Sequence, residues 1–437
     1  MPRVPADRCP RPSVDRPGDR SGAPQERWRF ATLLSAPHRL AFFSGMVLLA
    51  AASLWWTAIL VLRATAGAPP PFVIAPGFTH AFLMGGSFMP MFFAGFVCTA
   101  GPRWLRVPPV RAASLLPTAI GSLAGWVLFT AGAQLDAHIA AAGLGLVALS
   151  WSAFVLRFVR MIARSKADER LHLLVIAGAC AIGAAAFWWG AWALVTAQPA
   201  QLALAEAVLL HGFLAPVFIA ALHRMVPFFH VASPALERRF GNAPLWVLIG
   251  ALALPPIVQA LAAASAEVTM IRALHTLAFG VYAAVASLVA WLAWRWRSEQ
   301  NLHIRLLAML FAGLAWLGVA FVLQAADAFT IAVGRAPAFR LATLHALTMG
   351  FFASTMLAMV SRMTCGQAGR MLSSEHVVWR LFLALQAATV LRLVAAALPA
   401  YSTPLVAAAL VWTAAMLVWS LRYAGWYGRA RSDPRAR

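Results

Sequence analysis

Five histidines lie at or near the outer ends of apolar segments that are long enough to cross a membrane. They are His80, His138, His211, His275 and His345, in the second, fourth, sixth, eighth and tenth of these segments. The hydrocarbon interior of a bilayer disfavours a polar ring without a partner, and imidazole is the commonest metal ligand among side chains. Several imidazoles at one depth therefore indicate a metal or haem site.

His80 and His345 each precede a methionine by four residues, Met84 and Met349. Residues four apart share one face of a helix, so each pair presents an imidazole and a thioether together. These groups are ligands of b-type haem and of copper, and the thioether favours Cu(I). The spacing predicts that these four residues bind a cofactor. The alternative is that the methionines fill gaps in the helix packing, which is a common use of methionine.

The other three histidines differ in their surroundings. His211 lies about two turns inside its segment, five residues after Glu206, and this depth makes it a candidate metal ligand. His275 opens its segment among charged residues; it is a further candidate metal ligand, and a role at the surface fits its position equally well. His138 lies at a predicted loop and is interpreted as structural.

The cysteines do not extend this set of ligands. None of the four occurs in a C-x-x-C or C-x-x-C-H spacing, which argues against a disulfide framework and against covalent attachment of a c-type haem. Cys98, Cys180 and Cys365 lie in or near apolar segments and are interpreted as small core residues.

The apolar segments dominate the chain. Of its 437 residues 62% are hydrophobic and 11% are charged, and the mean hydropathy is +0.76, which is typical of an integral membrane protein. Twelve segments are each close to the ~20 residues that cross a bilayer. The sequence therefore predicts an all-α polytopic membrane bundle of about 12 transmembrane helices, at residues 40–62, 78–100, 110–132, 138–159, 171–195, 203–223, 244–262, 268–292, 304–326, 339–361, 377–398 and 404–425.

The formal net charge of +21 is distributed unevenly over the connections. Arginines cluster after the even-numbered segments, as at Arg103, Arg157, Arg224, Arg295 and Arg362, and are sparse in the other connections. The positive-inside rule then places these connections and both termini in the cytoplasm. The basicity is a sign of membrane orientation and not of nucleic-acid binding. A single lysine among 35 basic residues is typical of a GC-rich bacterial genome, and we expect membrane lipid around the bundle.

Both ends of the chain are polar. Residues 1–37 are rich in proline and arginine and lack the apolar core of a signal peptide, so they are predicted to be a disordered cytoplasmic tail. Residues 38–428 form the twelve-span membrane domain. Residues 429–437 are predicted to be a short cytoplasmic tail.

A faint internal repeat divides the membrane domain. His80, His211 and His345 are separated by 131 and 134 residues, which is the length of four segments. The last segment of each set of four ends with a tryptophan followed by an arginine, as at Trp151 and Arg157. These two regularities predict three four-helix units.

Three stretches carry the resemblance to a known family. Residues Thr79–Trp104 read THAFLMGGSFMPMFFAGFVCTAGPRW, and residues His345–Arg370 read HALTMGFFASTMLAMVSRMTCGQAGR. Residues His211–Phe229 add a weaker H-x-x-x and R-x-V-P-F-F pattern. These stretches resemble the signature blocks of the NnrS family.

The resemblance implies a haem- and copper-containing protein of the bacterial inner membrane, linked to nitric oxide metabolism and to nitrosative-stress tolerance. It implies haem b, with copper as a further metal, and nitric oxide or a related small molecule as the ligand. It supports His80 and His345 as site residues. The chain departs from the family pattern at Phe82 and Gln367, where the family usually has histidine.

Two other classes of protein fit part of the pattern. A secondary transporter would place ionisable residues within the spans, and Glu206 and Asp327 are the main candidates. An assembly or structural partner of a respiratory complex would need no ligand set at all. The number of spans and the positions of the histidines also resemble the haem–copper oxidases, but no adjacent histidine pair is present. Turnover as an oxidase or nitric oxide reductase is therefore not predicted.

Overall fold

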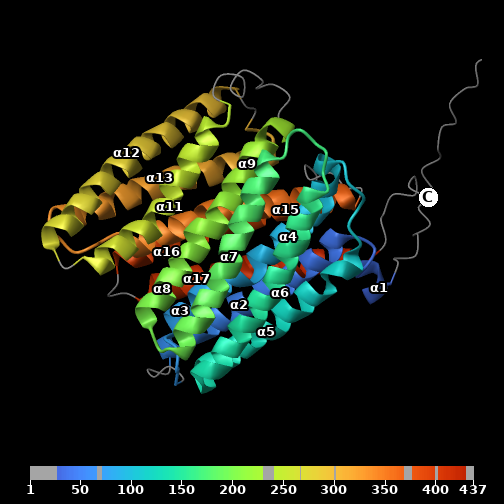
Figure 1. Cartoon of the computed structure of the whole chain (residues 1–437), viewed down its shortest axis with the longest axis horizontal. Coiled ribbons are helices and arrows are strands. Elements are labelled where there is room, and N and C mark those ends of the chain that lie inside the picture. Colours follow the sequence, from blue (N-terminus) through green and yellow to red (C-terminus); the bar gives the residue numbers. More distant parts are fainter. Residues whose placement is uncertain are drawn as a thin grey trace, which may run out of the picture.

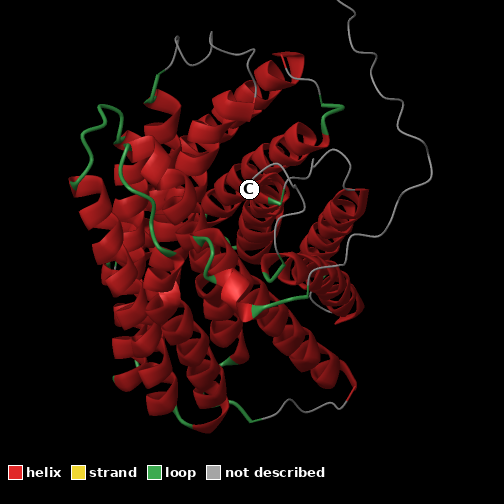
Figure 2. Ribbon diagram, turned by 90° about the vertical axis from the view of Figure 1, so that its right-hand side faces the viewer, coloured by secondary structure: helices red, strands yellow, loops and turns green. Residues whose placement is uncertain are grey.

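The computed structural model describes residues 27–65, 71–229, 241–265, 267–299, 302–368, 376–398 and 402–429. Over these ranges the secondary structure is entirely helical and no strand is present (Figure 2). Among the described residues, twelve helices are long and apolar enough to cross a membrane, and each predicted segment overlaps one of them over nearly its whole length. The prediction of an all-α bundle of twelve spans is confirmed.

The spans fall into three sets of four. The first set contains α2 (Pro37–Thr65), then α3 (Pro76–Phe82), η1 (Leu83–Ser87) and α4 (Phe88–Leu105) as one span, then α5 (Leu116–Leu135) after the short η2 (Ala112–Leu115), and α6 (Ala137–Ala163). The second contains α7 (Leu171–Val195), then α8 (Pro199–Val208), η3 (Leu209–Leu214) and α9 (Ala215–Phe229), then α11 (Ala243–Ala264) and α12 (Val268–Glu299). The third contains α13 (Arg305–Ala332), then α14 (Arg340–His345), η4 (Ala346–Phe352) and α15 (Ala353–Gln367), then α16 (His376–Ala397) and α17 (Ser402–Tyr427).

The packing repeats from set to set and closes into a ring. The last helix of each set packs along the first helix of the next, α6 on α7 and α12 on α13, and α17 packs on α2 to complete the circle. Figure 1 shows α5, α6 and α7 side by side along one face of the molecule. Within each set the third and fourth helices are also neighbours. The predicted three four-helix units are therefore present.

The second span of each set lies at the centre of the ring. In the most apolar stretches of these three spans 83%, 61% and 78% of the residues are buried, whereas no other span exceeds 56%. Aromatic rings join them: the Phe93 ring centroid lies 5.2 Å from that of Phe218, and the Phe218 centroid lies 4.6 Å from that of Phe352 in a stacked pair. The outer nine spans thus form a shell around three inner ones.

Each inner span contains one π-helical segment, namely η1, η3 or η4. A π-turn holds one more residue than an α-turn and is frequent at functional sites. Two of the three segments are followed closely by a proline, Pro90 or Pro216, whose missing N–H cannot bond to the preceding turn. The widened turn gives the proline ring the space that a regular helix would deny it.

The two ends of the described chain meet on one side of the bundle. The Trp28 indole donates to the Ala424 carbonyl at 3.1 Å, and the Arg29 N–H donates to the Gly428 carbonyl at 2.8 Å. The last part of the tail predicted over residues 1–37 thus contains a short helix, α1 (Phe30–Leu33), and residues 1–26 lie outside the described residues. We name this the terminal side of the bundle and the opposite one the distal side. That the terminal side faces the cytoplasm stays a prediction from the arginine distribution.

Helices α5 and α6 approach each other closely at Gly143, and a substitution there tests this packing. A Cβ at Gly143 would lie 2.4 Å from the Phe129 backbone nitrogen, whereas at Gly145, in the same helix, the nearest atom would be 3.9 Å away. Backbone atoms cannot turn aside as a side chain does. We expect Gly143→Val to destabilise the fold by about 1–3 kcal/mol and Gly145→Val to have little effect. Thermal unfolding of the two purified variants in detergent measures this; equal melting temperatures would contradict the packing.

Candidate functional site

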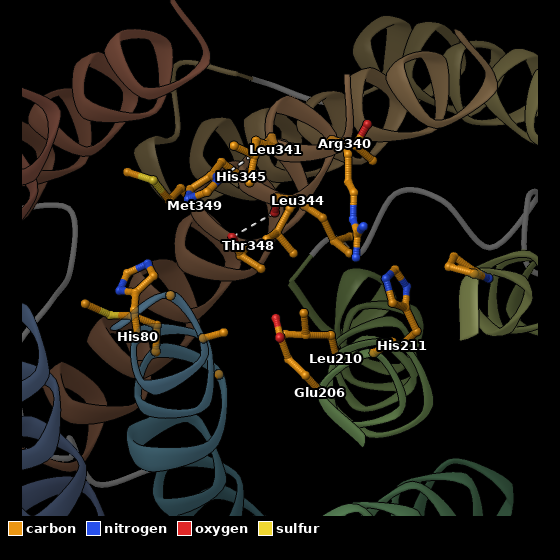
Figure 3. A pocket seen from close by; sticks show the side chains of 18 of the residues that line it. His80, Glu206, Leu210, His211, Arg340, Leu341, Leu344, His345, Thr348 and Met349 are labelled. Carbon is orange, nitrogen blue, oxygen red and sulfur yellow. Dashed lines mark hydrogen bonds between the residues drawn. The ribbon is translucent and has the colours of Figure 1, made fainter. Parts of the chain in front are cut away.

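All six residues predicted to bind a cofactor or metal line one cavity. This cavity has a volume of about 930 Å³ and lies in the distal half of the bundle. Its walls include the beginnings of the three inner spans (Figure 3). The predicted site residues on these walls are His80, Met84, His211, His275, His345 and Met349. The volume is within the range of roughly 300–1,000 Å³ that is usual for cofactor and ligand sites.

His345 is the last residue of α14 and lies directly before the π-segment η4. Its Nδ1 lies 2.7 Å from the carbonyl oxygen of Leu341, and only 9% of the surface of this residue is exposed. Because a carbonyl oxygen can only accept, Nδ1 must carry the proton in the neutral ring. This leaves a lone pair on Nε2, and a metal-binding histidine is commonly oriented in this way.

His80 lies in α3, five residues into the first inner span. Its ring stacks on the indole of Trp56 at a centroid distance of 3.9 Å and an interplanar angle of 21°. The His80 Nδ1 atom is buried and has no hydrogen-bond partner among the described residues. Stacking therefore fixes the plane of the ring, while its polar atoms remain available to a ligand.

The methionines predicted to accompany these two histidines share the same cavity. Figure 3 shows Met349 beside His345, one helical turn further along the inner span. Met84 lies in η1, four residues after His80. This side of the cavity thus offers two imidazoles and two thioethers from two inner spans.

The third inner span contributes a different pair. His211 lies within η3 and faces the same cavity as Glu206, which is in α8 (Figure 3). The Nδ1 atoms of His211 and His275 are buried without a described hydrogen-bond partner. Asp327 also lines the cavity, and its Oδ1 accepts from the Phe339 N–H at 2.9 Å. The cavity therefore has one side rich in imidazole and thioether and another that carries carboxylates.

The donors do not form a compact cage. Within the described ranges no three His, Cys, Asp or Glu side chains are grouped so that they could hold one metal ion. Haem iron needs only one or two ligands from the protein, because the macrocycle supplies the others. The arrangement therefore suits a cofactor that brings most of its own ligands.

Two arginines that line the cavity were not among the predicted site residues. Arg340 is the first residue of α14, and Arg392 lies near the distal end of α16. Arg392 could be predicted as a site residue from the sequence, because an arginine within an apolar span is itself a sign of function. Gln259, Gln324 and Tyr282 also line the cavity, and their residue types alone do not distinguish them from ordinary core residues.

The remaining histidines lie elsewhere. His138 is exposed at the start of α6, where its backbone N–H donates to the Asp136 side chain at 2.7 Å, and it does not line the cavity. On the terminal side, His172 Nε2 and His223 Nδ1 lie 2.9 Å apart. Their neighbour Glu169 pairs with Arg224, whose hydrogen bond holds the pKa of that carboxyl below its usual value. His230 lies outside the described residues.

The comparisons with known proteins bear on nearly the whole membrane domain. The model of the NnrS protein family matches residues 32–431. No curated protein matches the chain.

Proposed function

The chain belongs to the NnrS family, which is linked to the nitric oxide response, and from this premise we propose that it is a haem- and copper-binding protein of nitric oxide metabolism or nitrosative-stress tolerance. The observation that supports this most strongly is the convergence of His80 and His345 on one cavity from two different inner spans. Rigid helices hold ligands more precisely than loops do. The inferred cofactor is haem b.

The residues present fit such a group. The His345 ring is oriented by the Leu341 carbonyl and keeps a free Nε2, and the buried Nδ1 of His80 lacks a protein partner. A buried polar atom left unpaired costs about 1–3 kcal/mol, so these atoms are consistent with a ligand in the cavity. Met84 and Met349 add the soft donors that Cu(I) prefers, which makes copper the second metal of the proposal.

The opposite side of the cavity suits a small ligand. Bound haem would supply an iron atom with affinity for nitric oxide. On that side His211 and Glu206 lie on a wall that also includes apolar side chains such as Leu210 and Leu347. Nitric oxide is uncharged and dissolves in lipid, so it needs no charged path to reach this site.

The proposed location is the bacterial inner membrane with both termini in the cytoplasm. The arginines concentrate on the terminal side, so the cavity would open toward the outer half of the bilayer. A lipid-soluble ligand would then reach the histidines without crossing the arginine-rich surface.

Metal analysis and spectroscopy of the purified full-length protein test the proposal. We expect bound iron, a Soret band, and a shift of that band when nitric oxide is added to the reduced protein. A deletion strain should grow worse under a nitric oxide donor, and His211→Ala should restore growth less well than His138→Ala at equal membrane levels.

Other results would overturn the proposal. A colourless, metal-free protein and a deletion strain that grows like the wild type under the donor would favour the transporter interpretation. A protein that contains metal only when purified with a respiratory complex would favour a structural partner.

A further inference from the structure

Two arginine side chains share the cavity with the histidines. Figure 3 shows the Arg340 side chain reaching from the start of α14 into the cavity, toward His211. Arg392 enters from α16, which lies outside the three inner spans, and is close enough to act electrostatically on both His80 and His345. The two positive charges therefore lie on the walls of the space that the proposed cofactor would fill.

Neither guanidinium is neutralised by a close carboxylate. In the described part of the chain, the ion pairs within 4 Å all involve Glu169, on the terminal side. Among the described residues, the cavity's own carboxylates, Glu206 and Asp327, do not come that close to either arginine, although Arg340 acts electrostatically on Glu206. Asp327 already accepts a backbone hydrogen bond. This matters most for Arg392, because an arginine held within an apolar span without a close counter-ion is costly, and a partner from outside the chain would lower this cost. Arg340 is exposed at the start of its span and contributes its charge to the cavity wall.

The positions of the arginines along their helices narrow the chemistry of that partner. Arg340 precedes His345 by five residues at the distal end of its span, and Arg392 lies five residues before the end of α16. Both charges thus lie at the distal end of the cavity, and the aromatic side chains of Trp56 and Trp412 lie on the apolar part of its walls. A ligand that fits has a flat apolar body and two anionic groups at one edge. Haem b has this form, with two propionate carboxylates.

We propose that Arg392 and Arg340 bind the two propionate carboxylates of haem b and so set its orientation in the cavity. This inference rests on the proposed function. Guanidinium and carboxylate form charge-assisted, often bidentate hydrogen bonds, which are stronger and more directional than neutral ones. His80 and His345 would bind the iron, and the arginines would bind the propionates at the edge of the macrocycle.

The test compares haem b with its dimethyl ester, in which both carboxylates are masked. The full-length protein, depleted of haem and kept in detergent, is titrated with each compound, and the Soret band reports the dissociation constant. We expect the wild type to bind haem b at least about tenfold more tightly than the diester. Arg392→Met and Arg340→Met should each weaken binding of haem b by about tenfold and leave binding of the diester unchanged.

Two further variants serve as controls. Arg63→Met removes an exposed arginine from the distal part of α2, outside the cavity, and should change neither dissociation constant. Arg392→Lys keeps the charge and should retain part of the preference for haem b.

Two outcomes would overturn the inference: equal binding of haem b and the diester by the wild type, or an equal loss of both in the arginine variants. Failure of the proposed function has a different signature, because the wild type would then bind neither compound.

Discussion

His80→Ala and His345→Ala are each expected to remove most of the Soret absorbance of the purified protein. Each change deletes an imidazole that reaches the cavity from a separate inner span. The loss of affinity should exceed the roughly 10–100-fold that is typical when only a group that orients a metal ligand is lost. Absorbance at equal protein concentration, with iron measured in the same samples, gives the result.

His138→Ala is the matched control for this experiment. His138 is also on the distal side but is exposed and outside the cavity. Size-exclusion profiles should be alike for all three variants, because twelve apolar spans hold the fold together and no single imidazole does. Identical spectra in the three variants would refute the assignment of His80 and His345 as ligands.

Insertion of one alanine after Thr348 is expected to abolish the haem signal although His345 and both methionines remain in the chain. Thr348 lies within η4, a π-segment that already holds one more residue than an α-helical turn. A further residue turns the part of the span before it by about 100° relative to the buried α15, since an α-helix has 3.6 residues per turn. His345 would leave the cavity, while α15 and Met349 would keep their places.

Insertion of one alanine after Ala336 provides the comparison. Ala336 lies in the connection before α14, so the extra residue lengthens a loop without turning the helix. Integration into the membrane and stability should be similar in the two variants, and only the variant altered after Thr348 should lose the Soret band. If that variant keeps its haem, the rotation of the span before η4 does not position His345.

The number, type and grouping of the spans could be predicted from the sequence, because apolar length and arginine distribution are set by the bilayer itself. The gathering of His80, His211 and His345 could also be predicted in outline from their regular spacing. Their depths in the membrane are harder to predict from the sequence. His211 follows the start of its span by many more residues than the other two, and it still lines the same cavity. Counting residues along a helix does not include its tilt or the starting height of the span.

Other features of the site depend on packing that no local pattern records. The π-segments follow from the way the inner spans fit their neighbours; at Gly350, a Cβ would lie 2.6 Å from Trp316 Cγ. Arg392 lies in the apolar part of its span, and only the fold shows that it faces the cavity and not lipid. The Leu341 carbonyl that orients His345 belongs to the backbone, so residue types alone do not reveal it.

The closed ring of three sets also means that a chain of about a third of this length could build the same architecture as a homotrimer. Each copy would pack its fourth helix on the first helix of the next, as α6 does on α7, and the third copy would close the circle. Such a trimer would present three identical histidines to its axis, and all three would have the same neighbouring residues and the same function. Fusion into one chain removes that constraint: two sets keep a methionine beside the histidine, and the third has Glu206 and His211 instead.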